Sequence, residues 1–132
     1  MFIGNFKDMT ILNSLNIDNI DPQILSSISD LKELKELSIK DSNISSTSFL
    51  NGLSSLEKLS LKKNKLKDIL FISKIPTLRS LDISENLVED LSPLYSLEKL
   101  YSFKAEGNPI KDCPLNSVSF SLKSFCEKRV GL

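Results

Sequence analysis

The chain has 132 residues, 40 % of them hydrophobic, so it is long enough for one domain with a sizeable core and too short for two ordinary domains. Its 17 lysines and arginines balance its 17 aspartates and glutamates, which removes the global electrostatic argument for a protein that binds nucleic acid or a membrane surface. The absence of histidine excludes imidazole metal sites and the usual acid–base partner of a nucleophilic serine or cysteine.

The first residues, MFIGNFKDMTIL, lack the apolar run and the small-residue cleavage site of a secretory signal, and no stretch reaches the length of a membrane span. The two cysteines, Cys113 and Cys126, are too few for a disulfide framework, so we expect reduced thiols. These features predict an intracellular protein, in the cytoplasm or the nucleus, without contact to a membrane.

A period of 22 residues runs through the chain, and several columns of residues keep the same phase. The clearest apolar columns are Leu12, Leu34, Leu56, Leu78 and Leu100; Leu15, Leu37, Leu59, Leu81 and Phe103; and Ile17, Ile39, Leu61, Ile83 and Ala105. Stacked repeats are therefore predicted within a single domain over residues 1–132. Residues 1–33 form a capping region with a degenerate repeat, 34–110 the regular repeats and 111–132 a C-terminal cap.

Each regular repeat is predicted to contain a short strand followed by a 3₁₀ segment. Residues 81–84 alternate between apolar and polar, as a strand with one buried face does. Leu91, Leu94 and Leu97 follow at intervals of three, and residues at that interval eclipse one another in a 3₁₀ helix. Ile69 and Ile72 show the same spacing one repeat earlier.

A polar column follows the strands, consisting of Ser42, Asn64, Asn86 and Asn108. An inward asparagine can donate two hydrogen bonds and accept others, so it satisfies turn backbone groups that stacking removes from water. Serine can do part of this work. Ile20 occupies the position in the first repeat, which indicates a degenerate capping unit.

The C-terminal cap is predicted to contain a helix over residues 117–129, because Val118, Leu122 and Phe125 lie at helical spacing.

The pattern L-x-x-L-x-L-x-x-N-x-L, carried most clearly by LDISENLVEDLSPLYSLEKL at residues 81–100, resembles that of the leucine-rich repeat family. The resemblance is strongest to the short-repeat class that includes a regulatory subunit of protein phosphatase 1, the acidic leucine-rich nuclear phosphoproteins and the spliceosomal A-prime protein. It implies an α/β solenoid with a short parallel sheet on the concave side, 3₁₀-like returns on the convex side and a C-terminal helical cap.

Motifs for catalysis and for metal or cofactor binding are missing from the sequence. There is no glycine-rich phosphate loop. DSNISSTSFLNG begins like a calcium loop at Asp41, but Ser46 stands where glycine is needed and Gly52 where the bidentate glutamate belongs. Cys113 shares the column of Leu91 and is interpreted as a small buried apolar residue. We therefore expect no enzyme, no cofactor, no metal and no small-molecule substrate.

The outward residues of the strands are predicted to form three rows on the concave face and to bind another protein or protein complex. The rows are Ser14, Glu36, Lys58, Ser80 and Ser102; Asn16, Ser38, Ser60, Asp82 and Lys104; and Asp18, Lys40, Lys62, Ser84 and Glu106. The candidate partner-binding residues are Lys40, Lys58, Lys62, Lys63, Arg79, Asp82, Glu85, Tyr101 and Lys104. Arg79 and Tyr101 are the expected hot spots, because binding energy concentrates in arginine and aromatic side chains. The apolar residues outside the core columns form a second candidate patch: Phe49, Leu70, Phe71 and Tyr95 near the convex turns, and Leu87 and Tyr101 near the strand ends.

The predicted function is a non-enzymatic protein-binding scaffold within a larger intracellular assembly. One alternative is a component of a spliceosome- or ribosome-type ribonucleoprotein that contacts RNA through its lysines. The resemblance to the spliceosomal protein favours this alternative, whereas the neutral charge and scarce concave aromatics disfavour it. The other alternative is a regulatory subunit of a phosphatase or motor complex.

Overall fold

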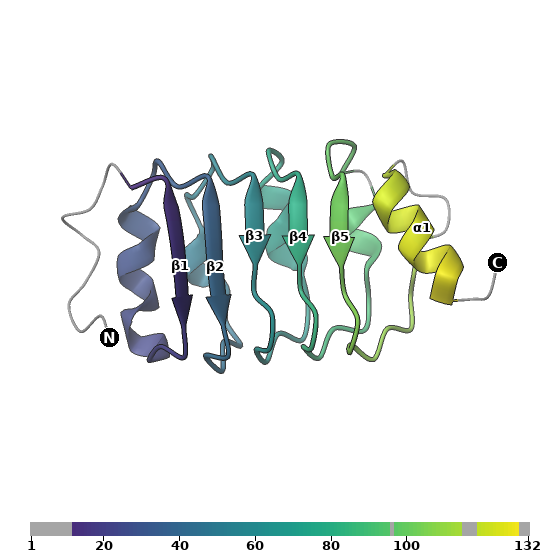
Figure 1. Ribbon diagram of the computed structural model, residues 1–132, viewed down its shortest axis with the longest axis horizontal. Coiled ribbons are helices and arrows are strands. Elements are labelled where there is room, and N and C mark those ends of the chain that lie inside the picture. Colours follow the sequence, from purple (N-terminus) through teal and green to yellow (C-terminus); the bar gives the residue numbers. More distant parts are fainter. Residues whose placement is uncertain (1–11, 96, 115–118, 130–132) are drawn as a thin grey trace.

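Five parallel strands form one sheet in the computed structural model, which describes residues 12–95, 97–114 and 119–129. The strands lie side by side in chain order (Figure 1). They are β1 (Ser14–Asp18), β2 (Glu36–Lys40), β3 (Lys58–Ser60), β4 (Ser80–Asp82) and β5 (Ser102–Lys104). Paired residues are one repeat apart, so that Leu37 lies between Leu15 and Leu59. Each predicted repeat therefore contributes one strand.

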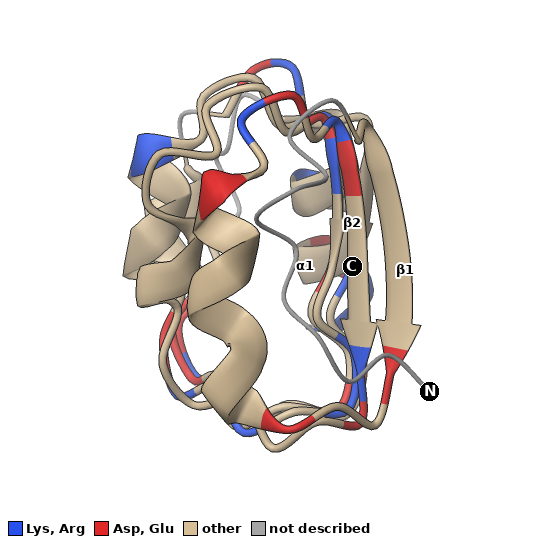
Figure 2. Ribbon diagram, turned by 90° about the vertical axis from the view of Figure 1, so that its left-hand side faces the viewer, with Lys and Arg blue, Asp and Glu red and all other residues tan. Residues whose placement is uncertain are grey.

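In the described part of the chain, four 3₁₀ helices form a second layer, opposite the sheet (Figure 2). They are η1 (Pro22–Asp30), η2 (Ser48–Leu50), η3 (Leu70–Lys74) and η4 (Ser92–Leu94). The N–H of Ile72 donates to the carbonyl of Ile69 over 3.1 Å, and the N–H of Ile75 donates to the carbonyl of Ile72 over 3.0 Å. These are the i to i+3 bonds of a 3₁₀ turn, so the helix type predicted from the spacing of three is confirmed.

The hydrophobic core lies between these two layers. Inward strand residues such as Leu59 and returning residues such as Ile72 and Leu94 are buried. Leu15 and Ile17 of β1 are only half-buried, since β1 has a described neighbouring strand on one side alone. Each repeat thus covers the apolar surface of the next, as expected for a stacked array.

Asn64 lies inside the turn that follows β3. Its Nδ2 donates to the carbonyls of Ile39 and Leu61, both over 2.9 Å. Its Oδ1 accepts from the N–H groups of Ser42 and Ile44, over 3.0 and 3.1 Å. One buried side chain therefore links two repeats and satisfies backbone groups of both.

The other members of the polar column repeat this arrangement. Asn86 and Asn108 both donate from Nδ2 to the carbonyl of Ile83, each over 2.9 Å. Ser42 uses its hydroxyl to accept from the N–H of Ile20 over 3.0 Å. The column thus points inward, as the sequence predicts, and forms a ladder of hydrogen bonds through the repeats.

The residue before each member of this column, and the residue before Ile20 at the equivalent place in the first repeat, has a left-handed backbone. Asn19, Asp41, Lys63, Glu85 and Gly107 have φ between 53° and 82°. Only glycine takes this conformation without a steric cost from Cβ. Lys63 and Glu85, both candidate binding residues, therefore have a strained backbone. They lie on the turns after β3 and β4, and both are exposed.

A short α-helix, α1 (Phe120–Arg129), packs next to β5 at the end of the sheet. The side chains of Leu122 and Cys126 are buried, and the ring of Phe125 meets the ring of Phe103 edge-on, with centroids 5.2 Å apart. The predicted cap helix is therefore present. It begins at residue 120, and residues 117–118 lie outside the described residues.

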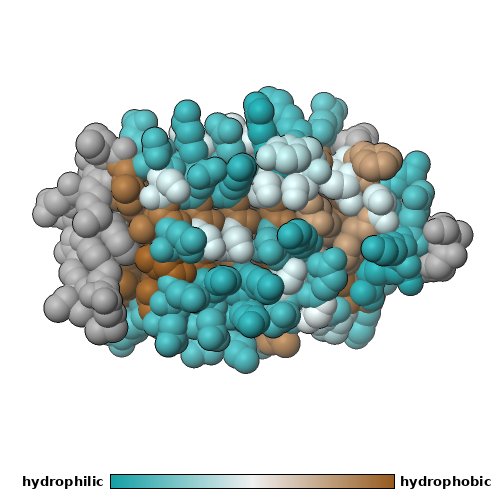
Figure 3. All heavy atoms as spheres, viewed as in Figure 1, coloured by the Kyte–Doolittle hydropathy of each residue, from teal (hydrophilic) through white to brown (hydrophobic). Residues whose placement is uncertain are grey.

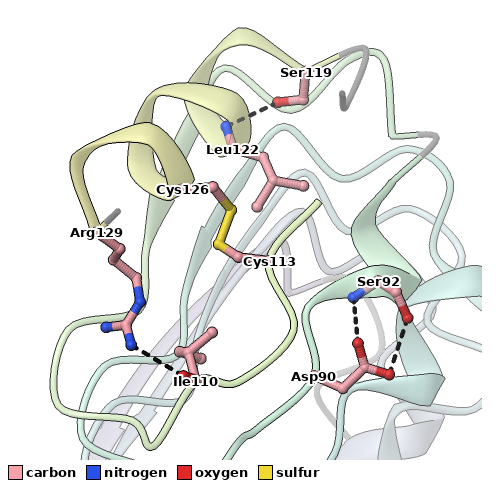
Figure 4. The surroundings of a disulfide bond; sticks show 8 residues. All are labelled: Asp90, Ser92, Ile110, Cys113, Ser119, Leu122, Cys126 and Arg129. Carbon is pink, nitrogen blue, oxygen red and sulfur yellow. Dashed lines mark hydrogen bonds between the residues drawn. A yellow bond between two sulfur atoms is a disulfide. The ribbon is translucent and has the colours of Figure 1, made fainter. Parts of the chain in front are cut away.

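The two cysteines form a disulfide bond, so the expectation of reduced thiols is wrong. Cys113 follows the last repeat, Cys126 lies on α1, and their Cα atoms are 5.6 Å apart (Figure 4). Cys113 is half-buried, in contrast to its predicted full burial. The sequence contained no sign of the bond, because only the packing of α1 against the last repeat brings the two residues together.

Candidate binding surface

The outward strand residues form two rows in the predicted order. One row is Ser14, Glu36, Lys58, Ser80 and Ser102, and the other is Asn16, Ser38, Ser60, Asp82 and Lys104. We call this surface the sheet face. It corresponds to the predicted concave face, and its regularity follows from the constant register between strands.

A shallow groove of about 250 Å³ crosses the sheet face from β1 to β4. Ser38, Ser60 and Ser80 line it, and their short side chains leave Leu37 and Leu59 as part of its lining. Figure 3 shows a hydrophobic band along the middle of this face, with hydrophilic residues on both sides. The groove can therefore accept both apolar and polar groups.

Charges of both signs surround the groove. Glu36 and Lys58 form an exposed ion pair with an N–O distance of 3.4 Å, and such pairs contribute about 0–1 kcal/mol. The carboxylate of Asp82 accepts a hydrogen bond from the N–H of Ser84 over 2.9 Å. Among the described residues, neither Lys40 nor Lys104 forms an ion pair. These two lysines are available to a partner.

The predicted third row leaves the sheet after β2. Lys40 is the last residue of β2, whereas Lys62, Ser84 and Glu106 lie on the turns that follow the shorter strands β3, β4 and β5. Ser84 is buried and Lys62 is half-buried. The expectation of an outward Ser84 is therefore wrong, because the chain has already begun to turn into the interior.

Arg79 and Tyr101 lie at the leading edge of the sheet, the side at which the strands begin. They directly precede β4 and β5, and the N–H of Tyr101 donates to the carbonyl of Arg79 over 2.8 Å. Both side chains are exposed. The two predicted hot spots are thus neighbours that border the sheet face instead of lying on it.

Phe120, which was not predicted as a site residue, lies beside the start of β5. The hydroxyls of Ser119 and Ser121 both donate to the carbonyl of Leu100, over 2.9 and 3.0 Å. These bonds hold the start of α1 beside Leu100, the residue that precedes Tyr101 in the chain. Phe120 belongs to no repeat column, and only its phase on the cap helix relative to Leu122 could have indicated its exposure.

The predicted convex patch is only partly present. Phe49 and Phe71 are 5 % and 7 % exposed and belong to the core, so their assignment to a surface patch is wrong. Leu70 and Tyr95 are exposed. The two phenylalanines fill space between successive 3₁₀ returns, which a repeat pattern built on leucine columns does not reveal.

The remaining surface offers little chemistry. Two hollows of about 310 and 460 Å³ lie beside η2 on the layer opposite the sheet, and Ser45, Ser46 and Ser48 line both of them. The pKa of Lys111 is raised by its hydrogen bond to Glu89 and by the charge of that carboxylate, 2.9 Å away. Within the described ranges, no acidic and cysteine side chains gather into a possible metal site, and no helix has the length and apolarity to cross a membrane.

No family model and no curated protein matches the chain. Among solved structures, internalin C2 of Listeria monocytogenes is 31 % identical and aligns with 86 % of the chain at a TM-score of 0.74. The chain is a leucine-rich repeat protein.

Two further solved structures share the leucine-rich repeat fold. A leucine-rich repeat protein of Leptospira interrogans aligns with 96 % of the chain, at 18 % identity and a TM-score of 0.65. The functional domain of InlJ from Listeria monocytogenes aligns with 89 %, at 19 % identity and a TM-score of 0.69. The short-repeat class named from the sequence stays a prediction.

This leucine-rich repeat protein spans half of the internalin C2 chain, 37 % of the Leptospira chain and 26 % of the InlJ chain.

Proposed function

We propose that this leucine-rich repeat protein is a non-enzymatic scaffold that binds a protein partner on its sheet face, as a subunit of a larger assembly. The observation that carries the proposal is the groove across β1 to β4, lined by side chains that a constant register holds in rows. A surface that is already ordered loses little conformational entropy on binding.

The size of the sheet face limits the partner. Five strands at a spacing of about 4.8 Å extend over about 19 Å, which matches about 13 residues of α-helix. The groove volume of about 250 Å³ is below the ~300–1,000 Å³ of typical small-molecule pockets. A single helix or loop of another protein is the best fit.

RNA is the second candidate partner. Lys62 and Lys63 form no ion pair within the described part of the chain, which favours a phosphate ligand. Asp82, Glu85 and Glu106 lie on the neighbouring strand and turns, where they would repel the RNA backbone. A protein is therefore a better candidate partner than RNA. The alternative role as a regulatory subunit of a phosphatase or motor complex rests on the sequence resemblance alone.

We further propose that the protein works in an oxidising compartment, in place of the intracellular location predicted from the sequence. The disulfide between Cys113 and Cys126 supports this, since such bonds persist mainly outside the reducing cytosol. Trapping free thiols with a maleimide reagent in freshly quenched cells would test the proposal. Labelling of both cysteines without prior reduction would contradict it.

Affinity purification with mass spectrometry would identify the partner, and titration of the two purified proteins would then test the binding face. In the variant carrying Ser38→Arg and Ser60→Arg, two long charged side chains fill the groove. Binding should weaken by at least about tenfold, or 1.4 kcal/mol.

The matched control carries Ser26→Arg and Ser54→Arg, which add the same groups to exposed positions outside the sheet. This control should bind like the wild type, and both variants should keep the wild-type melting temperature. If the control loses binding while the groove variant keeps it, the sheet face is not the binding surface.

A further inference from the structure

Three exposed side chains lie on segments that hydrogen bonds join near the end of the sheet, and we call them the aromatic corner: Arg79, Tyr101 and Phe120. Phe120 and Tyr101 are 84 % and 63 % exposed and are among the most exposed large hydrophobic side chains in the described residues. Scattered exposed apolar residues are normal on protein surfaces. Two aromatic residues and an arginine on adjoining elements are a denser arrangement, and these residue types carry most hot-spot energy.

The backbone under the aromatic corner is held by hydrogen bonds. The carbonyl of Leu100 accepts from the hydroxyls of Ser119 and Ser121, on either side of Phe120. The carbonyl of Arg79 accepts from the N–H groups of Tyr101 and Ser102, over 2.8 and 3.2 Å. Figure 1 shows α1 beginning on the same side of the molecule as the strands begin. The three side chains therefore start from ordered positions and need little further ordering to bind.

The core does not need the side chain of Phe120. At about 100° per residue, Leu122, Phe125 and Cys126 form one face of α1, and Phe120 lies roughly opposite the middle of that face. Leu122 and Cys126 are buried, whereas Phe120 is exposed. Removal of its ring should therefore leave the cap intact.

The charge at the aromatic corner favours an acidic ligand. Arg79 forms no ion pair within the described residues, although its N–H bonds to the carbonyl of Glu57. Lys99 and Lys123 lie near Tyr101 and Phe120 in the chain. The nearby acids are Glu98 on the same loop and Glu57, which is opposite Arg79 in the preceding repeat, so three cations face two carboxylates. A free guanidinium presents a fork of donors that matches a carboxylate.

We infer that the aromatic corner binds a peptide segment of a protein partner in which an apolar side chain lies next to a carboxylate. The apolar side chain packs against Tyr101 and Phe120, and the carboxylate accepts from Arg79. This inference rests on the proposed function in protein binding. It adds a second contact at the leading edge and states what the partner must present there.

Random peptides displayed on phage provide a probe that needs no known partner. Selection on the wild-type protein, with counter-selection on Arg79→Ala/Phe120→Ala, should enrich peptides with an aromatic or aliphatic residue adjacent to aspartate or glutamate. A synthetic enriched peptide should lose about thirtyfold in affinity for Phe120→Ala, the effect of removing a hot-spot residue. Its acid-to-amide version should bind the wild type more weakly but bind Arg79→Ala with unchanged affinity.

The matched control is Leu70→Ala/Leu87→Ala, which removes two other exposed apolar side chains and should bind the peptide like the wild type. The inference is overturned if no peptide enriches beyond the counter-selected variant, or if enriched peptides lack an acid. It is also overturned if the corner binds vesicles of phosphatidylcholine and phosphatidylserine and no peptide. The groove variant with Ser38→Arg and Ser60→Arg distinguishes failure of this inference from failure of the proposed function. If the groove variant loses binding to the partner while Arg79→Ala/Phe120→Ala keeps it, the inference fails and the proposed function stands.

Discussion

Asn86→Leu tests the ladder of buried asparagines. Leucine has nearly the same shape as asparagine, so the substitution removes hydrogen bonds without opening a cavity. Asn86 donates from Nδ2 to the carbonyls of Leu61, Ile83 and Ser84, and it accepts from the N–H of Leu66 over 3.0 Å. The effect on stability depends on which of these groups keep another partner.

Each of the three carbonyls keeps a second hydrogen-bond donor after the substitution. Their second donors are Asn64 Nδ2 at Leu61, Asn108 Nδ2 at Ile83 and the N–H of Lys63 at Ser84. The buried N–H of Leu66 has no second acceptor among the described residues. An unsatisfied buried donor costs about 1–3 kcal/mol, and the weakened bonds at the carbonyls add to this, so the free energy of unfolding should fall by about 2–4 kcal/mol.

Urea denaturation followed by circular dichroism measures this change. Asn64→Leu should be more destabilising, because Asn64 accepts from two N–H groups, those of Ser42 and Ile44. The control Asn13→Leu alters an exposed asparagine and should have little effect. If Asn86→Leu unfolds within about 0.5 kcal/mol of this control, the reasoning from the buried Leu66 N–H is refuted.

Three further measurements test other features of the fold and surface. Cys113→Ala should lower the free energy of unfolding by about 3 kcal/mol, because the disulfide joins residues 13 apart in the chain, and a reductant should remove the difference from the wild type. Glu85→Gly should raise the free energy of unfolding by about 0.5–1 kcal/mol, because glycine adopts a left-handed backbone without strain. Gly107→Ala should lower the free energy of unfolding, because its Cβ would lie 3.1–3.3 Å from atoms of Glu85. The isolated protein should not bind single-stranded RNA in a salt-dependent way, whereas contacts by Lys62 and Lys63 would each contribute a slope of about −0.7 to the log–log dependence of affinity on salt. A sub-micromolar association that is lost at high salt would place RNA before protein as the partner.

The repeat architecture could be predicted from the sequence because it depends on spacings within one or two repeats. Alternation over residues 81–84 indicated the strand that the structure has at Ser80–Asp82. The spacing of Leu91 and Leu94 indicated the return that contains η4. The period of 22 residues then set the register of the sheet, since equivalent residues of stacked repeats must pair. The rows of the sheet face followed from that register.

The left-handed turns could not be predicted in the same way. The conformation recurs at five equivalent repeat positions from Asn19 to Gly107, and four of these residues are not glycine. The residue type at these positions therefore does not reveal the left-handed backbone. The backbone adopts it because the strand must turn sharply to bring the next side chain, such as Asn86, into the interior.

The sequence by itself determined the repeat, its two kinds of secondary structure and the inward polar column, because all of these follow from local periodicity. Only the tertiary structure decided the disulfide, the burial of Phe49 and Phe71, and the position of the start of α1 beside Leu100. The disulfide and the position of the start of α1 depend on how the C-terminal segment, which does not follow the repeat, packs against the stack. Phe49 and Phe71 are one repeat apart, and their burial depends on the space between successive returns. Spacing along the chain does not encode such packing, which is decided by the shape of the space that the repeats leave between and beside them.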